Sequence, residues 1–204
     1  MQIVYLCARP AVLAGTIASV RTHLSFVDRI LAVVPERARE VVAALGAEVV
    51  TDEEMLGEAP PEDHQRRNWA LRSALATHAA VDEVFLMSDD DSRPLTHLDE
   101  TTFLSEGRHR RYMFGWLDEW HHQSSSFDLG QQATRQVLAL YGFPRRAYAS
   151  HMPQVIDKAM LAEVVRVLST AAALSPLCEW TGYFNVAPSR HPARFHDPEP
   201  YVTL

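Results

Sequence analysis

The sequence predicts an α/β fold with a mostly parallel central sheet and helices on both faces. In the first half, short apolar runs alternate with longer stretches in which apolar residues recur at helical spacing. Such alternation is typical of strand–helix–strand units, whose helices cover both faces of a parallel sheet. The 204 residues suffice for one domain of this kind and not for two large ones, and no repeat or low-complexity linker divides them. We therefore expect a single domain over residues 1–204.

The elements expected in the first half follow from apolar spacing and from residues that begin or end helices. Leu13, Ile17 and Val20 share one helical face. Pro35 favours a helix start, and Gly46 favours the end of the same helix. The expected strands span residues 3–7, 27–34, 48–51 and 81–87, the expected helices span 11–24, 35–45 and 62–78, and residues 52–61 are expected to form a loop. In sheets of this kind, ligands bind at the carboxyl ends of the strands.

The second half of the sequence is less regular. Residues 131–141 are expected to be helical. A turn at residues 151–153 is expected to begin another helix, with Ile156 and Met160 on its buried face. The tail, residues 189–204, is rich in proline and is expected to lie as extended chain over a surface. The alternation of strands and helices thus holds for the first half alone.

Composition and charge exclude several classes of protein. The formal net charge is −7 without a basic tract, which argues against non-specific nucleic-acid binding, because such binding needs a positive face. Cys7 and Cys178 are the only cysteines, too few for a disulfide framework or a zinc site. Residues 1–6 lack the cationic region of a signal peptide, and no stretch is apolar enough to span a bilayer. We therefore expect a cytoplasmic protein without a transmembrane segment.

An acidic cluster follows the most apolar of the expected strands. Val84–Met87 is typical of a fully buried strand, and it leads through Ser88 into Asp89, Asp90 and Asp91. Adjacent carboxylates repel one another unless a cation or basic side chains neutralise them. In an extended chain the first and third point to one side and the second to the other. The pattern predicts Mg²⁺ or Mn²⁺ at the first and third, shared with substrate phosphates, and a solvated acidic turn is the alternative.

Arginines occur at two places where a ligand phosphate would lie. Arg66 and Arg67 stand near the amino end of a predicted helix, where the helix dipole disfavours cations, so either ligand binding or solvation explains them. Arg9 follows the first strand at the same sheet edge as the acidic cluster. The glycine patterns of dinucleotide-binding folds and P-loops are absent, as are the serine-hydrolase elbow and the H-E-x-x-H zinc motif. These absences exclude the commonest nucleotide and hydrolase motifs.

Two segments together resemble nucleotide-sugar glycosyltransferases of the GT-A fold. They are Arg67-Asn68-Trp69-Ala70-Leu71 and Phe85-Leu86-Met87-Ser88-Asp89-Asp90-Asp91. In that family a helix with Arg-Asn near its start precedes a buried strand that ends in a D-x-D motif. The resemblance implies a Rossmann-like GT-A fold, with a nucleotide-sugar-binding half over residues 1–95 and an acceptor-side half over residues 96–204.

The GT-A resemblance implies a nucleoside-diphosphate sugar as donor, with UDP as the favoured carrier. The implied ligands of Mn²⁺ or Mg²⁺ are Asp89, Asp91 and a histidine of the carboxyl-terminal part, His196 first and His191 second. The implied donor-binding residues are Arg9, Arg67, Asn68 and Asp90, the last directed at sugar hydroxyls. Residues 34–36 lack the aspartate that many family members place near the base, which leaves the base open.

An inverting transfer needs a carboxylate that takes the proton from the acceptor hydroxyl. Glu179 is the first candidate, because its neighbours Cys178 and Trp180 would raise its pKa. Asp118 or Glu119 is the competing candidate. His151 would contact the acceptor or the diphosphate, or else simply begin a helix. Trp116, Trp120 and Trp180 would either offer ring faces to a sugar or belong to the core. The acceptor, a small molecule or a glycan, stays unidentified.

Other functions remain open at this point. Residues His151-Met152-Pro153, Glu179-Trp180 and Tyr183-Phe184-Asn185 are similar to small bacterial glycosyltransferase-like families and to Stealth-type sugar-phosphate transferases. A sugar-1-phosphate transferase would use the same donor and metal but attack at phosphorus. A nuclease or phosphatase would draw carboxylates from several strands, whereas one dense cluster is evident. A non-catalytic nucleotide-sugar-binding module is the remaining alternative.

Overall fold

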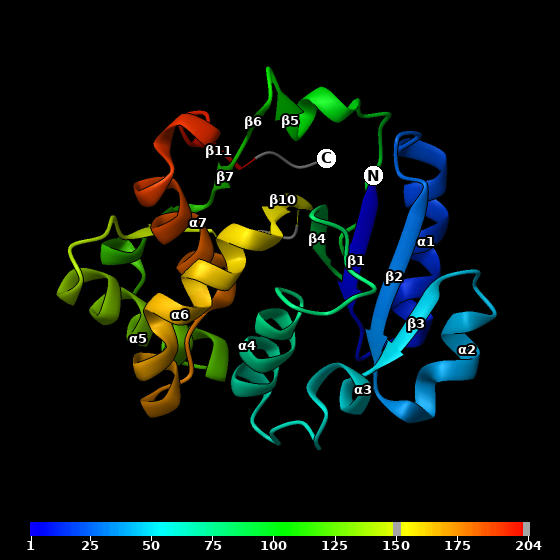
Figure 1. The fold of residues 1–204 in the computed structure, drawn as a ribbon, viewed down its shortest axis with the longest axis horizontal. Helices are drawn as coiled ribbons and strands as arrows, with labels where there is room; N and C mark the ends of the chain where they lie inside the picture. Colours follow the sequence, from blue (N-terminus) through cyan, green and yellow to red (C-terminus); the bar gives the residue numbers. More distant parts are fainter. Residues whose placement is uncertain (149–151, 202–204) are drawn as a thin grey trace.

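A five-stranded sheet forms the centre of the molecule, in a computed structural model that describes residues 1–148 and 152–201 (Figure 1). The strands are β1 (Gln2–Leu6), β2 (Arg29–Val34), β3 (Glu48–Thr51), β4 (Val84–Asp89) and β10 (Gln154–Asp157). Their order is β10-β4-β1-β2-β3, and only the pairing of β10 with β4 is antiparallel within this sheet. The predicted mostly parallel sheet is therefore confirmed.

The register of the sheet brings the acidic cluster beside the end of the first strand. β1 pairs with both β2 and β4, and Leu6 stands opposite Val33 on one side and Asp89 on the other. Along β1, Tyr5 faces one apolar cluster while Val4 and Leu6 face a second cluster on the opposite side of the sheet. Both faces of the sheet are thus buried, which explains why the strand sequences are continuously apolar.

Helices cover both faces of the sheet, as predicted (Figure 1). One face carries α1 (Pro10–His23) and, after a 3-10 turn at Glu36–Ala38, α2 (Arg39–Ala43). The other face carries α4 (His64–Ala74), α5 (Ser126–Leu140), α6 (Lys158–Leu174) and α7 (Glu179–Arg190), and α3 (Asp52–Leu56) lies beside α4. The carboxyl ends of β1 and β4 and the start of α4 lie around one cavity, which Leu6, Asp89 and His64 line.

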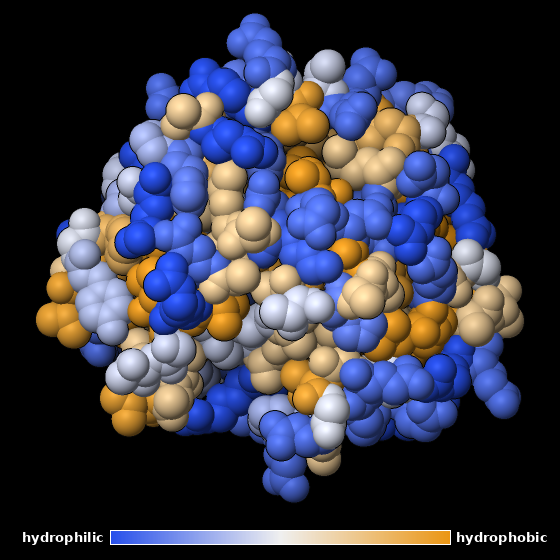
Figure 2. Space-filling view, viewed as in Figure 1, coloured by the Kyte–Doolittle hydropathy of each residue, from blue (hydrophilic) through white to orange (hydrophobic). Residues whose placement is uncertain are grey.

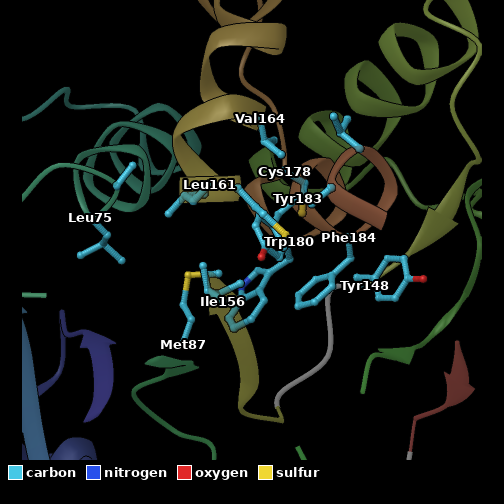
Figure 3. Packing of buried hydrophobic residues seen from close by; sticks show 14 of the residues in the cluster. Leu75, Met87, Tyr148, Ile156, Leu161, Val164, Cys178, Trp180, Tyr183 and Phe184 are labelled. Carbon is cyan, nitrogen blue, oxygen red and sulfur yellow. The ribbon is translucent and has the colours of Figure 1, made fainter. Parts of the chain in front are cut away.

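Helix α7 is buried along most of its length and organises the second layer. Trp180, Tyr183 and Phe184 of α7 pack with Leu161 of α6 and Ile156 of β10 (Figure 3). Every residue from position 179 to 188 of this helix is buried. A helix buried on all sides has no polar face, so no amphipathic period marks it in the sequence.

Several expected boundaries differ from the structure, and three of the differences lie at a helix cap. The loop expected over residues 52–61 instead begins with α3, whose start is stabilised by a capping box between Thr51 and Glu54. Helix α5 begins at Ser126, ahead of the expected residue 131, because Ser125 caps it through the backbone N–H of Asp128. The helix expected to include Ile156 begins only at Lys158, so that residue lies in strand β10.

Short strand pairs and 3-10 turns complete the second half. The pairs are formed by β5 (Leu104–Ser105) with β6 (Arg108–His109), β7 (Tyr112–Met113) with β11 (Glu199–Pro200), and β8 (Gly115–Trp116) with β9 (Arg146–Ala147). The 3-10 turns span Glu100–Thr102, Leu117–Glu119 and Pro192–Arg194. The expectation of an extended tail is correct only in part. Strand β11 pairs with β7, but the end of α7 and a 3-10 turn form the first residues of the tail.

Apolar and hydrophilic residues interleave over the face that Figure 2 shows, in small groups. Across residues 1–148 and 152–201, no helix is long and apolar enough to cross a membrane.

His109 is a titratable side chain buried between the tail and the small strands. Its ring packs edge to face against Phe195, with 5.2 Å between the ring centroids. Neither ring nitrogen of His109 has a hydrogen-bond partner in the described part of the chain. Burial lowers the pKa of His109 to about 4; nearby Arg194 adds to this and Asp157 opposes it. The folded protein therefore holds this histidine in its neutral form.

The unprotonated state of His109 predicts an acid-dependent loss of stability. An unfolded chain protonates this histidine near pH 6.5, whereas the folded chain resists until about pH 4. The free energy of unfolding should consequently fall as the pH drops through this window, by roughly 3 kcal/mol. Urea unfolding of wild type and His109→Leu between pH 7 and pH 4 tests this. The variant should show a flatter pH dependence, and equal slopes would contradict the assignment.

Candidate active site

A cavity of about 610 Å³ opens at the carboxyl ends of β1 and β4. The loop after β1, the acidic cluster after β4, the face of α4 and the first residues of α7 all line it. Side chains of two kinds meet there: carboxylates with arginines, and aromatic rings. The structure thus places the acidic cluster at the expected sheet edge, where the end of β4 and the turn after it line a cavity.

Asp90 secures the loop that follows β1. Its carboxylate accepts hydrogen bonds from the backbone N–H groups of Ala8 and Arg9, both at 3.2 Å, and from the Arg9 guanidinium at 2.5 Å. Its own carbonyl accepts a bond from the Thr16 hydroxyl of α1 at 2.6 Å. The side chain is almost completely buried. These contacts make Asp90 a structural link between two strand ends, and its contact with donor hydroxyls stays a prediction.

Asp89 and Asp91 both line the cavity and each pairs with an arginine. Asp89 Oδ1 lies 2.5 Å from Arg72 Nη2, and Asp91 Oδ2 lies 3.0 Å from Arg9 Nη2. The Asp91 side chain is 37% exposed, and the Asp89 side chain is also partly open. The two guanidinium groups offset the electrostatic repulsion among the three adjacent carboxylates. All three aspartates line the cavity, but the side chains of Asp89 and Asp91 are partly open to it whereas that of Asp90 is buried against the loop after β1.

Arg72 joins the acidic cluster to the candidate base and was missed by the sequence analysis. Its side chain is only 3% exposed, pairs with Asp89, and places Nε 3.0 Å from Oε1 of Glu179. Its guanidinium carbon also lies 4.5 Å from the centre of the Trp180 ring. The available signal was helical spacing, because Arg72 stands one turn after Asn68 on the same face of α4.

Glu179 occupies the first position of α7 and faces the cavity from a buried site. Its Oε2 accepts a hydrogen bond of 2.9 Å from Gln65, which also donates to the carbonyl of Leu177. Burial raises the pKa of Glu179; the charge of Asp89 adds to the rise, and Arg72 opposes it. A carboxylate so desolvated and so oriented is suited to accept a proton.

Arg67 and Asn68 line the cavity from α4, and their contact with a donor stays a prediction. Arg67 pairs with the buried Asp52, with its Nη2 and Nε at 2.6 Å and 3.0 Å from Oδ2. Asn68 lies 3.2 Å from Nε2 of His64, one helical turn earlier, and both line the cavity. Arg67 is therefore a fixed and mostly buried cation, which removes the solvated interpretation.

Both candidate histidine ligands make other contacts. The Nε2 atom of His196 lies 3.0 Å from the carbonyl of Ser105, and this histidine is not among the cavity residues. The pairing of β11 with β7 holds that part of the tail in place. His191 instead pairs with Glu163 on α6 at 2.6 Å. The structure thus does not bring either histidine together with the acidic cluster.

Two further predicted residues also lie elsewhere. Asp118 forms an exposed ion pair with Arg145 at 2.8 Å, and neither Asp118 nor Glu119 lines the cavity. Of the three candidate bases, Glu179 is therefore the one that lines the cavity. His151 lies outside the described residues, so its predicted contact with acceptor or diphosphate stays a prediction.

The donor set at the acidic cluster suits one kind of metal site. In the described ranges, no group of three or more histidine, cysteine, aspartate or glutamate side chains is arranged to hold a metal ion. Mg²⁺ and Mn²⁺, however, commonly bind through one or two carboxylates and complete their shell with water and substrate phosphates. Asp89 and Asp91 fit that arrangement, whereas a site closed by protein ligands alone does not fit.

The molecule has the fold of GT-A glycosyltransferases. The galactosyltransferase LgtC, solved in complex with donor and acceptor sugar analogs, superposes with a TM-score of 0.50 at 16% identity. That match covers 91% of this chain and 71% of LgtC. No known protein family and no curated protein matches the sequence. Nothing in these comparisons points to the Stealth-type transferases.

Glucosyl-3-phosphoglycerate synthase from M. tuberculosis is similar over a smaller part of its length. Its structure matches with a TM-score of 0.45 at 16% identity, over 78% of this chain and 57% of the synthase. The same synthase in complex with Mn²⁺, UDP and glucosyl-3-phosphoglycerate matches with a TM-score of 0.43 at 15% identity, over 85% of this chain and 67% of the synthase. This chain therefore spans little more than half of the synthase in the first of these matches.

The buried position of Arg72 predicts a large cost for its removal. Arg72→Leu would leave Asp89 and Glu179 without their shared counter-charge, and we expect a loss of about 3–5 kcal/mol in the free energy of unfolding. Arg190→Leu is the matched control, because it breaks the ion pair between Arg190 and Glu163. The Arg190 side chain is 44% exposed, so this change should lower the free energy of unfolding by less than about 1 kcal/mol. Urea unfolding measures both, and similar small losses would contradict this account.

Proposed function

We propose that this chain is a metal-dependent glycosyltransferase that moves a sugar from a nucleoside-diphosphate sugar, with UDP favoured, to an acceptor hydroxyl. One observation carries the proposal: a single cavity holds the carboxylate pair Asp89 and Asp91, the arginines beside them and the buried carboxylate of Glu179. The GT-A fold supports it, and so does LgtC, whose structure contains donor and acceptor sugar analogs in the same fold.

The donor would bind at the acidic end of the cavity. Asp89 and Asp91 would hold Mn²⁺ or Mg²⁺, and such an ion neutralises charge on a diphosphate leaving group. Arg9 is the more exposed of the paired arginines there and would donate charge-assisted hydrogen bonds to phosphate oxygens. Arg67 and Asn68 would contact the nucleotide from α4. Asp90 would keep the loop after β1 in the position that these contacts need.

Glu179 would serve as the base in an inverting transfer. Its carboxylate would take the proton of the acceptor hydroxyl as that oxygen attacks the anomeric carbon. Gln65 and Arg72 hold one carboxylate oxygen each, so the orientation of the group is set before substrate arrives. Because burial favours the protonated form, the carboxylate is a stronger base here than in water.

Asp91→Asn tests the donor site. Isothermal titration of UDP and GDP, with and without Mn²⁺, should show metal-dependent binding of one nucleotide by wild type and at least about a tenfold loss in the variant. Asp82→Asn is the matched control: its side chain is 38% exposed and paired with Arg29, much as Asp91 is 37% exposed and paired with Arg9. Failure of both nucleotides to bind, with or without Mn²⁺, would overturn the proposed function.

Glu179→Gln tests the base while keeping the shape of the side chain. With water as acceptor, release of UDP from UDP-sugars should slow by roughly 10²–10⁴-fold while UDP binding is retained. Glu163→Gln, on the surface of α6, should leave the rate unchanged. Release of UMP by wild type would indicate attack at phosphorus and a sugar-1-phosphate transferase. If wild type binds the donor but does not turn it over, the chain is a nucleotide-sugar-binding module.

A further inference from the structure

Four aromatic side chains form a second wall of the cavity, which we call the aromatic wall. It consists of Phe114, Trp120, Phe127 and Trp180. Three of them come from the segment between β7 and the start of α5, and the fourth follows Glu179 on α7. The proposed donor site uses none of these rings, so their place in the cavity requires another explanation.

The aromatic wall is held in place by contacts within the protein. The indole N–H of Trp120 donates to Oδ1 of Asp128 at 3.1 Å, and Asp128 is fixed in turn by the capping box at the start of α5. The Trp120 ring also meets Phe114 and Phe127 edge to face, at centroid distances of 6.1 Å and 5.8 Å. A ring so fixed loses little conformational entropy when a ligand stacks on it.

Phe114 leaves a large apolar surface open at this wall. Its side chain is 58% exposed although it borders the cavity, and its ring contacts are with Trp120 and Tyr201 at 6.1 Å each. Aromatic surface exposed to water is unfavourable, so a ligand that covers the ring lowers the free energy of the system. A ligand with a flat apolar face would supply that cover.

The charges of the cavity disfavour an anionic group at the aromatic wall. Each of its three arginines already faces a carboxylate: Arg9 faces Asp91, Arg67 faces Asp52, and Arg72 faces Asp89 and Glu179. An added phosphate or carboxylate would meet the negative charge of the acidic cluster, and the donor diphosphate would compete for the same arginines. The wall is therefore complementary to an uncharged ligand.

We infer that the aromatic wall is the acceptor subsite and that it takes an uncharged ring, either a pyranose or an aromatic aglycone. This inference rests on the proposed function. Trp180 is 3% exposed and lies between Arg72 and Phe184, so it borders the wall beside its chain neighbour Glu179 and leaves the ring contact to Phe114, Trp120 and Phe127. A ring stacked on Phe114 or Trp120 would occupy the same cavity as the carboxylate that takes the proton. The acceptor class is thus set by apolar contact and not by charge.

Binding of neutral and charged probes tests the acceptor class. The probes are p-nitrophenyl glucosides and galactosides on one side and glucose 6-phosphate and galactose 6-phosphate on the other, each titrated into the full chain with UDP and Mn²⁺ present. Saturation-transfer NMR and quenching of tryptophan fluorescence report binding. Wild type should bind a neutral glycoside more tightly than either sugar phosphate.

Phe114→Ala and Trp116→Ala form a matched pair of variants. Both residues are exposed aromatics of the same segment, but Trp116 does not line the cavity and instead lies 5.4 Å from the guanidinium of Arg146. Phe114→Ala should weaken binding of the neutral glycoside by at least about fivefold, and Trp116→Ala by less than about twofold. Binding of UDP with Mn²⁺ should be the same in both variants and in wild type.

Three results would overturn the inference: tighter binding of the sugar phosphates, no binding of any neutral glycoside by a chain that binds UDP, or equal glycoside affinity in wild type and Phe114→Ala. The proposed function fails in a different way. If neutral glycosides bind through Phe114 while no nucleotide binds, the aromatic wall is a sugar-binding site but the proposed glycosyltransferase function is wrong.

Discussion

The buried guanidinium of Arg72 is the interaction on which the candidate active site depends. It extends from α4 to Asp89 at the end of β4 and to Glu179 at the start of α7, and it lies against Trp180. A buried ion pair is stable only while both charges are present, since removing one leaves the other uncompensated in a medium of low dielectric constant. One side chain thereby holds three elements, distant in the sequence, in a single arrangement.

The acidic cluster divides its carboxylates between structure and site. The turn after β4 directs the carboxylate of Asp90 to the backbone of the neighbouring strand end, while Asp89 and Asp91 are more open to the cavity that all three residues line. The sheet register makes this possible, because Leu6 and Asp89 are direct neighbours across β1 and β4. Two parallel strands that end together thus create both the anchor and the proposed metal site.

The cavity combines two physical environments within one space. Paired charges from β1, β4 and α4 and aromatic rings from the second half of the chain line the same cavity. A transfer between a charged donor and a neutral acceptor would use both environments, with Glu179 and Trp180, adjacent in α7, between them. LgtC shares this fold, and the residues that line the cavity belong to this chain.

The sequence by itself determined the parallel sheet, the helix layers and the position of the acidic cluster, because apolar periodicity and turn residues are local signals. Burial of Glu179 among aromatic residues was also foreseen from its immediate neighbours. Only the tertiary structure decided that Arg72 joins Asp89 to Glu179, that α7 is a buried helix, and that His196 lies with Ser105 away from the cavity. The reason is physical: a helix buried on all sides carries no periodic pattern, and ion pairs between distant residues depend on how elements pack, which spacing along the chain does not encode.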